Sequence, residues 1–397
     1  MNRYLIGLAG IMLATSASAN DALTRQLDGV INRAIAENRI VGTVVLVAQN
    51  GEIVYRRAAG QFDREARTPM YEDAVFRLAS ITKPIVSATL MRLVEEDKLT
   101  LDDPVTKWLP AFRPQLDDGS RPVITLRQLL THTSGLSYRF VEPLDSDYHR
   151  LNISDGLDQP GLSLDENLRR LAQAPLVFAP GGGWRYSLGL DVLGAVIAEA
   201  SGKTLPQAVQ EAVLDPLQLA DTAFVPSDTS RLATPYADGE SEPVRMTDNM
   251  AVPIWNSVAH FAPSRATNAD SYPSGGAGMV GTAADVLRFL EVIRRGGEPI
   301  LAPDTVSAMM QDQVGGESEM QGPGWGFGYG WAVLDDPDAA GTPQSKGTIQ
   351  WGGAYGHSWF VDPVKKLTVV ALTNTAFEGM SGAFPMEIRD AVYEKND

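Results

Sequence analysis

Two β-rich runs near the start of the chain flank an Asn-Gly pair. Residues 41–49 and 52–59 carry many apolar and β-branched side chains, and Asn50-Gly51 between them favours a tight hairpin turn. The preceding residues, 21–37, have the apolar spacing of a helix. The pattern therefore predicts a helix followed by two antiparallel strands.

A second change of pattern follows at residues 75–85. A short apolar stretch, 75–78, gives way to apolar positions at three-to-four spacing between Ile85 and Leu93. We expect a helix from about Thr82, with Pro84 accommodated in its first turn.

The middle of the chain, residues 96–279, shows few strand signals. It contains capped helices and long loops rich in proline and glycine; Thr125 with Gln128 and Ser163 with Glu166 have capping-box spacing. Residues 139–161 are the least regular part, and form either a binding-site loop or solvated surface.

Strand patterns return in the C-terminal part. Thr282 can cap an amphipathic helix that ends near Gly296, and the later predicted elements are strands at 328–333, 348–352, 357–361 and 367–373 and a helix at 383–393. We predict an α+β fold in which residues 20–95 and 280–397 form one antiparallel sheet flanked by helices. Residues 96–279 form a mostly helical inserted domain, and the active site lies at the junction of the two parts.

The first nineteen residues have the pattern of an export signal. Arg3 is followed by an apolar stretch from Tyr4 to Ala14, which is too short to span a bilayer, and by the small residues Ala17-Ser18-Ala19. We expect a signal peptide over residues 1–19 and a soluble exported protein, periplasmic or secreted, with no membrane insertion of the mature chain. An uncleaved N-terminal anchor is the alternative.

Composition excludes several kinds of chemistry. The 397 residues are 44% hydrophobic and 21% charged, and their net charge of −16, or 32 − 49 = −17 without Arg3, argues against nucleic acid and other anionic partners. The chain has no cysteine, and its four histidines, His132, His149, His260 and His357, lack metal-ligand spacing. No metal and no cofactor is predicted.

Ser80-Ile81-Thr82-Lys83 places a hydroxyl and an amine at a predicted helix start. Ser80 lies at or just before the first turn and Lys83 projects on nearly the same face, so the two groups can meet. The Ser80 NH lacks an intrahelical acceptor there and could stabilise an oxyanion. A capping serine beside a surface lysine is the alternative.

Tyr186 occupies a second junction, between Pro180-Gly181 and a helical pattern that Gly202 can close. Close to Lys83, its phenolate would be favoured by the cation, and it could relay a proton between Ser80 and a substrate. A packed aromatic side chain is the alternative. Tyr272, in Tyr272-Pro273-Ser274, is a rival of similar pattern.

Trp351-Gly352-Gly353 ends one predicted strand shortly before the next begins at His357. Glycines in such a strand let another group approach the backbone closely, and NH groups of an edge strand could align an extended substrate. A plain glycine bulge is the alternative. The aromatic candidates for the walls of a substrate pocket, each of which could equally be a core residue, are Trp351, Tyr138, Trp184 and Trp359.

These three motifs, in this order, resemble those of the serine β-lactamase and penicillin-binding-protein superfamily. The likeness covers nearly all of the mature chain. Residues 129–136 and 275–289 resemble segments of the class C-like branch, and residues 186–191 and 351–363 resemble the family VIII carboxylesterases. The resemblance implies a β-lactamase/transpeptidase-like fold.

Two departures favour an esterase within this superfamily. Leu188 stands where β-lactamases have the asparagine of Tyr-x-Asn, and Trp351-Gly352-Gly353 replaces Lys-Thr-Gly, whose cation and hydroxyl engage a carboxylate. An aromatic wall without charge suits a neutral ester better than an anionic β-lactam. A Ser-His-Asp hydrolase is disfavoured because the chain has no Gly-x-Ser-x-Gly.

The resemblance implies a serine carboxylesterase that hydrolyses or transesterifies small-molecule esters, with short acyl chains, through an acyl-enzyme on Ser80. Lys83 and Tyr186 are the expected general-base pair, and the NH groups of Ser80 and Ala354 the oxyanion hole. The implied pocket residues are Trp351, Gly352, Gly353, Tyr138 and His357. The alternatives are a class C-like β-lactamase, a D-Ala-D-Ala carboxypeptidase or D-aminopeptidase, and a penicillin-binding-like protein without catalysis; the last is disfavoured because serine, lysine and tyrosine are all retained.

Overall fold

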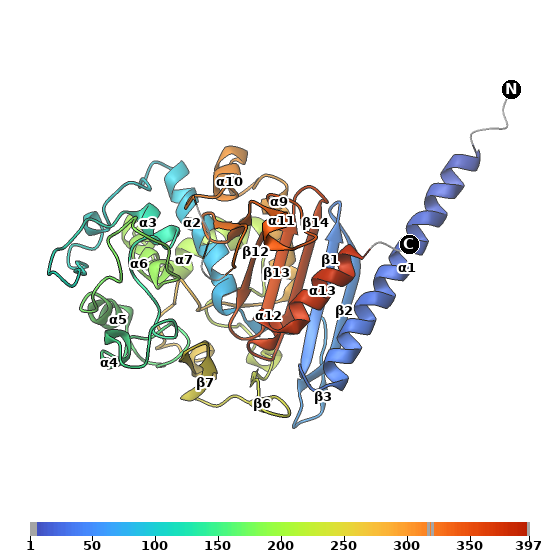
Figure 1. Cartoon of the computed structure of the whole chain (residues 1–397), viewed down its shortest axis with the longest axis horizontal. Coiled ribbons are helices and arrows are strands. Elements are labelled where there is room, and N and C mark those ends of the chain that lie inside the picture. The colour runs from blue at the N-terminus through green and yellow to red at the C-terminus, as the bar shows by residue number, and fades with distance from the viewer. Residues whose placement is uncertain (1–5, 316–317, 319–320, 395–397) are drawn as a thin grey trace.

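The computed structural model describes residues 6–315, 318 and 321–394, and within them eight antiparallel strands form one sheet (Figure 1). Their order is β10-β11-β12-β13-β14-β1-β2-β3, so strands from the two ends of the chain meet where β1 pairs with β14. The strands are β1 (Gly42–Gln49), β2 (Glu52–Asp63), β3 (Thr68–Pro69), β10 (Trp325–Phe327), β11 (Ala332–Leu334), β12 (Ile349–Gly353), β13 (His357–Asp362) and β14 (Leu367–Thr373).

Helices cover both faces of this sheet. α1 and α13 pack together on one face, where Ile31 and Phe384 are buried against Val45, and α9 contacts β1 and β14 on the other. α2 packs on α6 within the larger core. The helices are α1 (Ile6–Ala36), α2 (Thr82–Glu95), α3 (Leu126–Leu130), α4 (Asp147–Arg150), α5 (Leu164–Leu171), α6 (Gly189–Ser201), α7 (Leu205–Val209), α8 (Asp215–Leu217), α9 (Ala283–Arg294), α10 (Pro303–Met309), α11 (Pro337–Ala340), α12 (Glu378–Ser381) and α13 (Ala383–Tyr393).

The region between the two halves of the sheet consists of short helices joined by long loops, as Figure 1 shows for α3 to α7. Its short strands form three separate pairs, of which the hairpin of β7 and β8 was not predicted. These pairs are β4 (Phe76–Arg77) with β9 (Val280–Gly281), β5 (Tyr236–Ala237) with β6 (Val244–Arg245), and β7 (Met250–Ile254) with β8 (Ser257–Phe261). The division into domains at residues 95 and 280 stays a prediction.

The predicted strand at 328–333 is wrong. Only its last two residues belong to a strand, because residues 328–331 form the turn between β10 and β11, a hairpin in which Phe327 lies opposite Ala332. Gly330 in the connecting turn has φ +111°, in the left-handed region that favours glycine, so the chain reverses where a continuous strand was expected.

The N-terminal helix is longer than predicted. α1 begins at Ile6 rather than near residue 21, so it runs through the predicted cleavage site after Ala19. Figure 1 shows its N-terminal part extending away from the rest of the molecule. In the described part of the chain, no helix combines the length and apolarity needed to cross a membrane.

Candidate active site

Ser80 lies in a short 3₁₀ segment, η1 (Ala79–Ile81), that runs directly into α2. Ala79 has φ +46°, in the left-handed region that non-glycine residues rarely adopt, so the backbone is strained next to the serine. Lys83, in the first turn of α2, places its Nζ 3.1 Å from Ser80 Oγ and donates to the Gly276 carbonyl at 2.8 Å. The hydroxyl and the amine therefore meet.

Lys83 is fully buried. Burial lowers its pKa from the ordinary 10.5 to about 7, although the charges of Asp191 and Asp155 oppose this shift. A lysine with a pKa near 7 is partly neutral at physiological pH and can accept a proton.

Asp191, in the first turn of α6, is a buried carboxylate close to Lys83. A Cβ added at Gly276 would lie 2.6 Å from Asp191 Oδ2, 2.8 Å from the Tyr138 hydroxyl and 3.5 Å from Lys83 Nζ, so three polar groups converge on this glycine. Burial raises the pKa of Asp191, and the charge of Lys83 opposes that rise. The sequence offered one signal for this role, a carboxylate between the buried apolar residues Leu190 and Val192.

The Tyr186 hydroxyl reaches Ser80 from the opposite side of the fold. It donates to Ser80 Oγ at 2.8 Å and accepts a hydrogen bond from Trp351 Nε1 at 3.3 Å. Aromatic rings enclose its own ring, with centroid distances of 4.9 Å to Tyr138, 4.9 Å to His132 and 5.2 Å to Trp351. These contacts fix the position of the hydroxyl beside the serine.

The expectation that Lys83 favours the phenolate of Tyr186 is wrong for the resting site. Burial raises the pKa of Tyr186 well above its ordinary value of 10, and its hydrogen bonds with Ser80 and Trp351 offset only part of that rise. Desolvation therefore outweighs the neighbouring cation, which is itself partly neutral. Tyr186 stands ready as a proton donor.

β12 brings Trp351 and the glycines to the serine. It pairs with β13 from Ile349 to Gly353 but with β11 only at Ile349 and Gln350, which leaves its edge at 351–353 without a strand partner among the described residues. A Cβ at Gly353 would lie 2.4 Å from the Leu78 carbonyl oxygen, so only glycine lets β12 pack this closely on the segment before Ser80.

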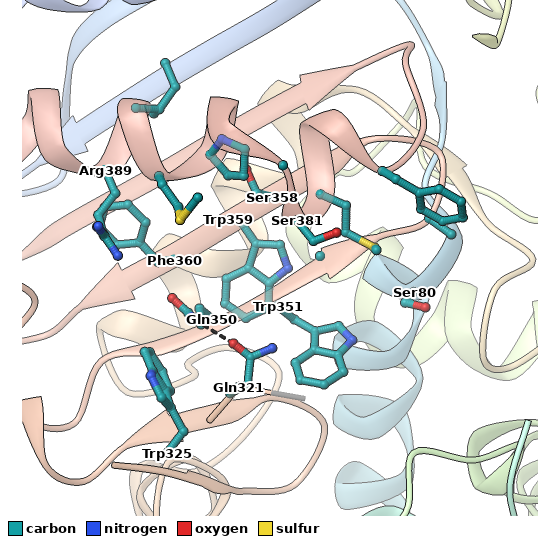
Figure 2. Close-up of a pocket in the computed structure, with 18 of the residues that line it drawn as sticks. Ser80, Gln321, Trp325, Gln350, Trp351, Ser358, Trp359, Phe360, Ser381 and Arg389 are labelled. Atoms are coloured by element: carbon teal, nitrogen blue, oxygen red, sulfur yellow. Dashed lines mark hydrogen bonds between the residues drawn. The ribbon is translucent and has the colours of Figure 1, made fainter. Parts of the chain in front are cut away.

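A cavity of about 410 Å³ opens beside Ser80. Figure 2 shows it running from Ser80 past Trp351 to Arg389 at the opposite end. Arg389 is the one charged side chain among the described residues that line it. Lining residues that the sequence had not singled out include Phe140, Leu157, Trp255, Gln321, Trp325 and Gln350.

Several of the predicted pocket residues line this cavity, namely Trp351, Gly352, Ala354 and Trp359, but others do not. His357 is buried with Nε2 2.8 Å from the Arg77 carbonyl oxygen, and burial lowers its pKa to about 4, so it is a neutral structural group. The predicted pocket residues that do not line the cavity, and pack behind its wall, are Gly353, Tyr138, Trp184 and His357.

Two further tyrosines that the sequence put forward, Tyr272 and Tyr138, make no hydrogen bond to Ser80 in the described structure. The Tyr272 hydroxyl accepts a hydrogen bond from Asn167 Nδ2 at 3.2 Å and takes no part in the contacts of Ser80. Tyr138 stacks beside Lys83, whose Nζ lies 5.2 Å from its ring centroid. Across the residues with described positions, no group of three acidic or histidine side chains is arranged to hold a metal ion.

Comparison with known proteins gives relatives over nearly the whole chain. The family described as Beta-lactamase matches residues 26–391. The chain is 56% identical over 378 residues to esterase EstB of Burkholderia gladioli, covering 94% of this chain and 96% of that protein. Among solved structures, it is similar to EstCE1, a hydrolase with promiscuous acyltransferase activity, with a TM-score of 0.92 and 51% identity over 95% of this chain and all of that one. A mutant of simvastatin synthase from Aspergillus terreus shares the fold, with a TM-score of 0.73 at 23% identity over 92% of this chain and 96% of that one.

Proposed function

The chain belongs to the β-lactamase family, which confirms the resemblance and the fold predicted from the sequence, and from this premise we propose that it is a serine carboxylesterase. The observation that carries the proposal is the convergence of Lys83 and Tyr186 on Ser80 Oγ, at 3.1 and 2.8 Å, at one end of a cavity with neutral walls. The esterase names of the relatives support the same conclusion.

Acylation follows from the protonation states of the three groups. Ser80 Oγ attacks the ester carbonyl and gives its proton to the neutral amine of Lys83. The NH groups of Ser80 and Ala354 stabilise the oxyanion that forms. Tyr186 donates its proton to the alkoxide as the ester C–O bond breaks, and the alcohol leaves.

Deacylation restores these states. A water molecule attacks the acyl carbonyl and gives its proton to the Tyr186 phenolate, while the Lys83 ammonium returns a proton to Ser80 Oγ as the acid leaves. A second alcohol in place of water gives transesterification with the same proton transfers. The acyltransferase activity in the description of EstCE1 fits this variant.

Neutral esters with short acyl chains fit the cavity best. Trp351 and Phe140 form apolar walls near Ser80, and Arg389, the one cation lining the cavity in the described structure, lies at its far end in Figure 2. A β-lactam or peptide carboxylate would therefore meet no cation on the cavity wall near the serine, since Lys83 is fully buried, partly neutral and not a lining residue. This distribution of charge favours the esterase over a lactamase or carboxypeptidase.

The direct test is hydrolysis of p-nitrophenyl acetate and butyrate by purified protein and by Ser80→Ala. We expect the substitution to abolish burst and steady-state release of p-nitrophenol. Ser87→Ala is the matched control, since Ser87 lies about two turns after Ser80, in α2, is buried and has no hydrogen-bond partner in the described structure. Full activity in Ser80→Ala would exclude the proposed nucleophile.

Export belongs to the proposal as well. We infer cleavage after Ala19 and a periplasmic or secreted mature protein, because residues 1–19 have the charge and apolar pattern of a signal peptide. The extension of the N-terminal part of α1 away from the body supports removal of this segment without loss of core packing. Mass spectrometry of the protein from a cell fraction should give an N-terminus at Asn20; an intact Met1 in active protein would contradict the cleavage.

A further inference from the structure

A second cavity, of about 150 Å³, adjoins the first, and Leu157 borders both. Its polar lining residues include Arg77 of β4, Arg265 of the 3₁₀ segment η5 (Pro263–Ala266) and Tyr355, the residue after Ala354, besides Asn268, Ser271 and Tyr272. We call it the arginine cavity.

Both arginines lack an acidic partner among the residues that the structure describes. Arg77 donates to the carbonyls of Pro263 and Ala233 through Nε and Nη1, and its Nη2 makes no hydrogen bond to a described residue. Arg265 donates to two carbonyls through Nη1 and Nη2, but its Nε is buried without a hydrogen-bond partner. Each guanidinium therefore keeps an unused donor.

Burial makes the charge of a guanidinium without an acidic partner energetically unfavourable. Arg265 is 8% exposed, and burial lowers the pKa of Arg77, although a guanidinium stays protonated at any ordinary pH. Two carboxylates act on these groups from nearby: Asp158 is already bound by Arg139 Nη2 and Ser154 Oγ, and Asp248 forms no ion pair with either arginine but accepts a hydrogen bond from the Ser264 NH at 3.0 Å. A buried charge without a counter-ion is unfavourable, so an anion entering this cavity would gain both Coulombic attraction and hydrogen bonds.

The other residues that line the arginine cavity indicate which kind of anion it would bind. They are mostly apolar, from side chains such as Leu157, Phe224, Ala277 and Met279. The planar donors of a guanidinium match the two oxygens of a carboxylate, and an apolar wall suits a hydrocarbon body better than a fully hydrated phosphate. The net charge of −16 weakens the attraction of an anion from a distance, but salt screens exposed charges over about 10 Å, so the contacts inside the cavity decide whether an anion binds there.

We propose that the arginine cavity binds a small organic carboxylate, with its head group between Arg77 and Arg265 and its apolar body against Leu157 and Met279. The Tyr355 hydroxyl has no hydrogen-bond partner in the described structure and faces the same charges, since both arginines act on it electrostatically. The site is separate from Ser80 and does not depend on the esterase reaction.

Calorimetric titration with sodium butyrate, at constant ionic strength, tests the site. We expect wild type and Ser80→Ala to bind equally, and Arg77→Gln and Arg265→Gln each to bind at least about tenfold more weakly, because an ionic hydrogen-bond donor is lost. Arg288→Gln is the matched control and should bind normally: Arg288 also donates to two backbone carbonyls but lines neither cavity.

Other outcomes would overturn the proposal. Unchanged affinity in both arginine variants, or loss of binding in Ser80→Ala, would assign butyrate to another place. Chloride or phosphate binding as tightly as butyrate would exclude selectivity for a carboxylate. If the arginine variants fail to fold, crystals of wild type soaked in 3-bromopropionate decide: an anomalous peak in the arginine cavity supports the site, and its absence there contradicts it.

Discussion

Burial shifts the pKa values of Lys83 and Tyr186 in opposite directions. It lowers the pKa of Lys83 to about 7 and raises that of Tyr186 well above 10, because each side chain is driven toward its neutral form. A neutral amine accepts a proton and a neutral phenol donates one. The same desolvation thus supplies both a base and an acid around Ser80.

Activity should rise with pH through about 7. Lys83 must lose its proton to act as the base, so kcat/KM for a neutral ester is low below its pKa and reaches a plateau above it. Rates of p-nitrophenyl acetate hydrolysis between pH 5 and 9, corrected for spontaneous hydrolysis, measure this. A flat profile from pH 5 to 8 would contradict the role of Lys83.

Asp155 provides the control for this profile, since burial raises its pKa to about 7 as well. Asp155→Asn should keep the rising limb and move it to lower pH, because the charge of Asp155 raises the pKa of Lys83. Lys83→Arg, which stays protonated, should remain inactive across the range. If Asp155→Asn lost the rise of kcat/KM with pH, the group that titrates near pH 7 would be Asp155 and not Lys83.

Tyr186→Phe should lower kcat by about 10²- to 10⁴-fold, the usual contribution of a general acid or base, because it removes the hydroxyl 2.8 Å from Ser80 Oγ. Steady-state kinetics and far-UV circular dichroism would separate catalysis from folding. Tyr393→Phe, which removes a hydroxyl that donates to Asp362 at 2.6 Å, is the control and should retain the rate. Near-normal turnover in Tyr186→Phe would require another proton donor.

At the level of elements, the close contact between β12 and η1 positions the nucleophile. Gly353→Ala would place its Cβ 2.4 Å from the Leu78 carbonyl oxygen and 3.0 Å from His357 Cδ2, so η1 must shift. We expect a loss of about 1–3 kcal/mol in the free energy of unfolding, typical of overpacking, together with a fall in kcat. Urea denaturation and ester hydrolysis measure the two effects.

Gly29→Ala is the control for that substitution. A Cβ at Gly29 on α1 meets no atom within 4 Å, so alanine should stabilise the helix by about 0.5–1 kcal/mol and leave the rate unchanged. If Gly353→Ala and Gly29→Ala had the same free energy of unfolding and the same rate of ester hydrolysis, the close contact between β12 and η1 would not require glycine at residue 353.

Elements with local signals could be predicted from the sequence, and contacts between distant segments could not. Thr82 begins α2 as expected, and Thr125 and Gln128 form the predicted capping box. Ser80, Lys83 and Tyr186 were found through their motifs. Asp191 gave only the weak signal of a carboxylate between Leu190 and Val192, and the wall residues Gln321 and Gln350 have no local pattern. His357 was misplaced because its hydrogen bond with the Arg77 carbonyl joins segments far apart in the sequence, and adjacency to β12 does not reveal that contact.

The whole molecule combines an acidic surface with an uncharged pocket entrance near Ser80. The net charge of −16 and the absence of a cation among the described residues lining that end both disfavour an anionic substrate. We expect kcat/KM for nitrocefin to be at least about 100-fold below that for p-nitrophenyl butyrate, since two or three kcal/mol of ionic binding is missing. Comparable values for the two substrates would contradict the neutral-ester assignment.

The pairing of β1 with β14 sets the order of events during biosynthesis. Thr43 pairs with Thr373, so the centre of the sheet closes only after almost the entire polypeptide has left the ribosome. Contacts so distant along the chain slow folding, and slow folding is compatible with the export proposed above, which requires an unfolded precursor. Ser80 and Lys83 are close neighbours in sequence, but Trp351 and the β14 strand are synthesised long after them, so we expect the nascent enzyme to stay inert until its synthesis is almost complete.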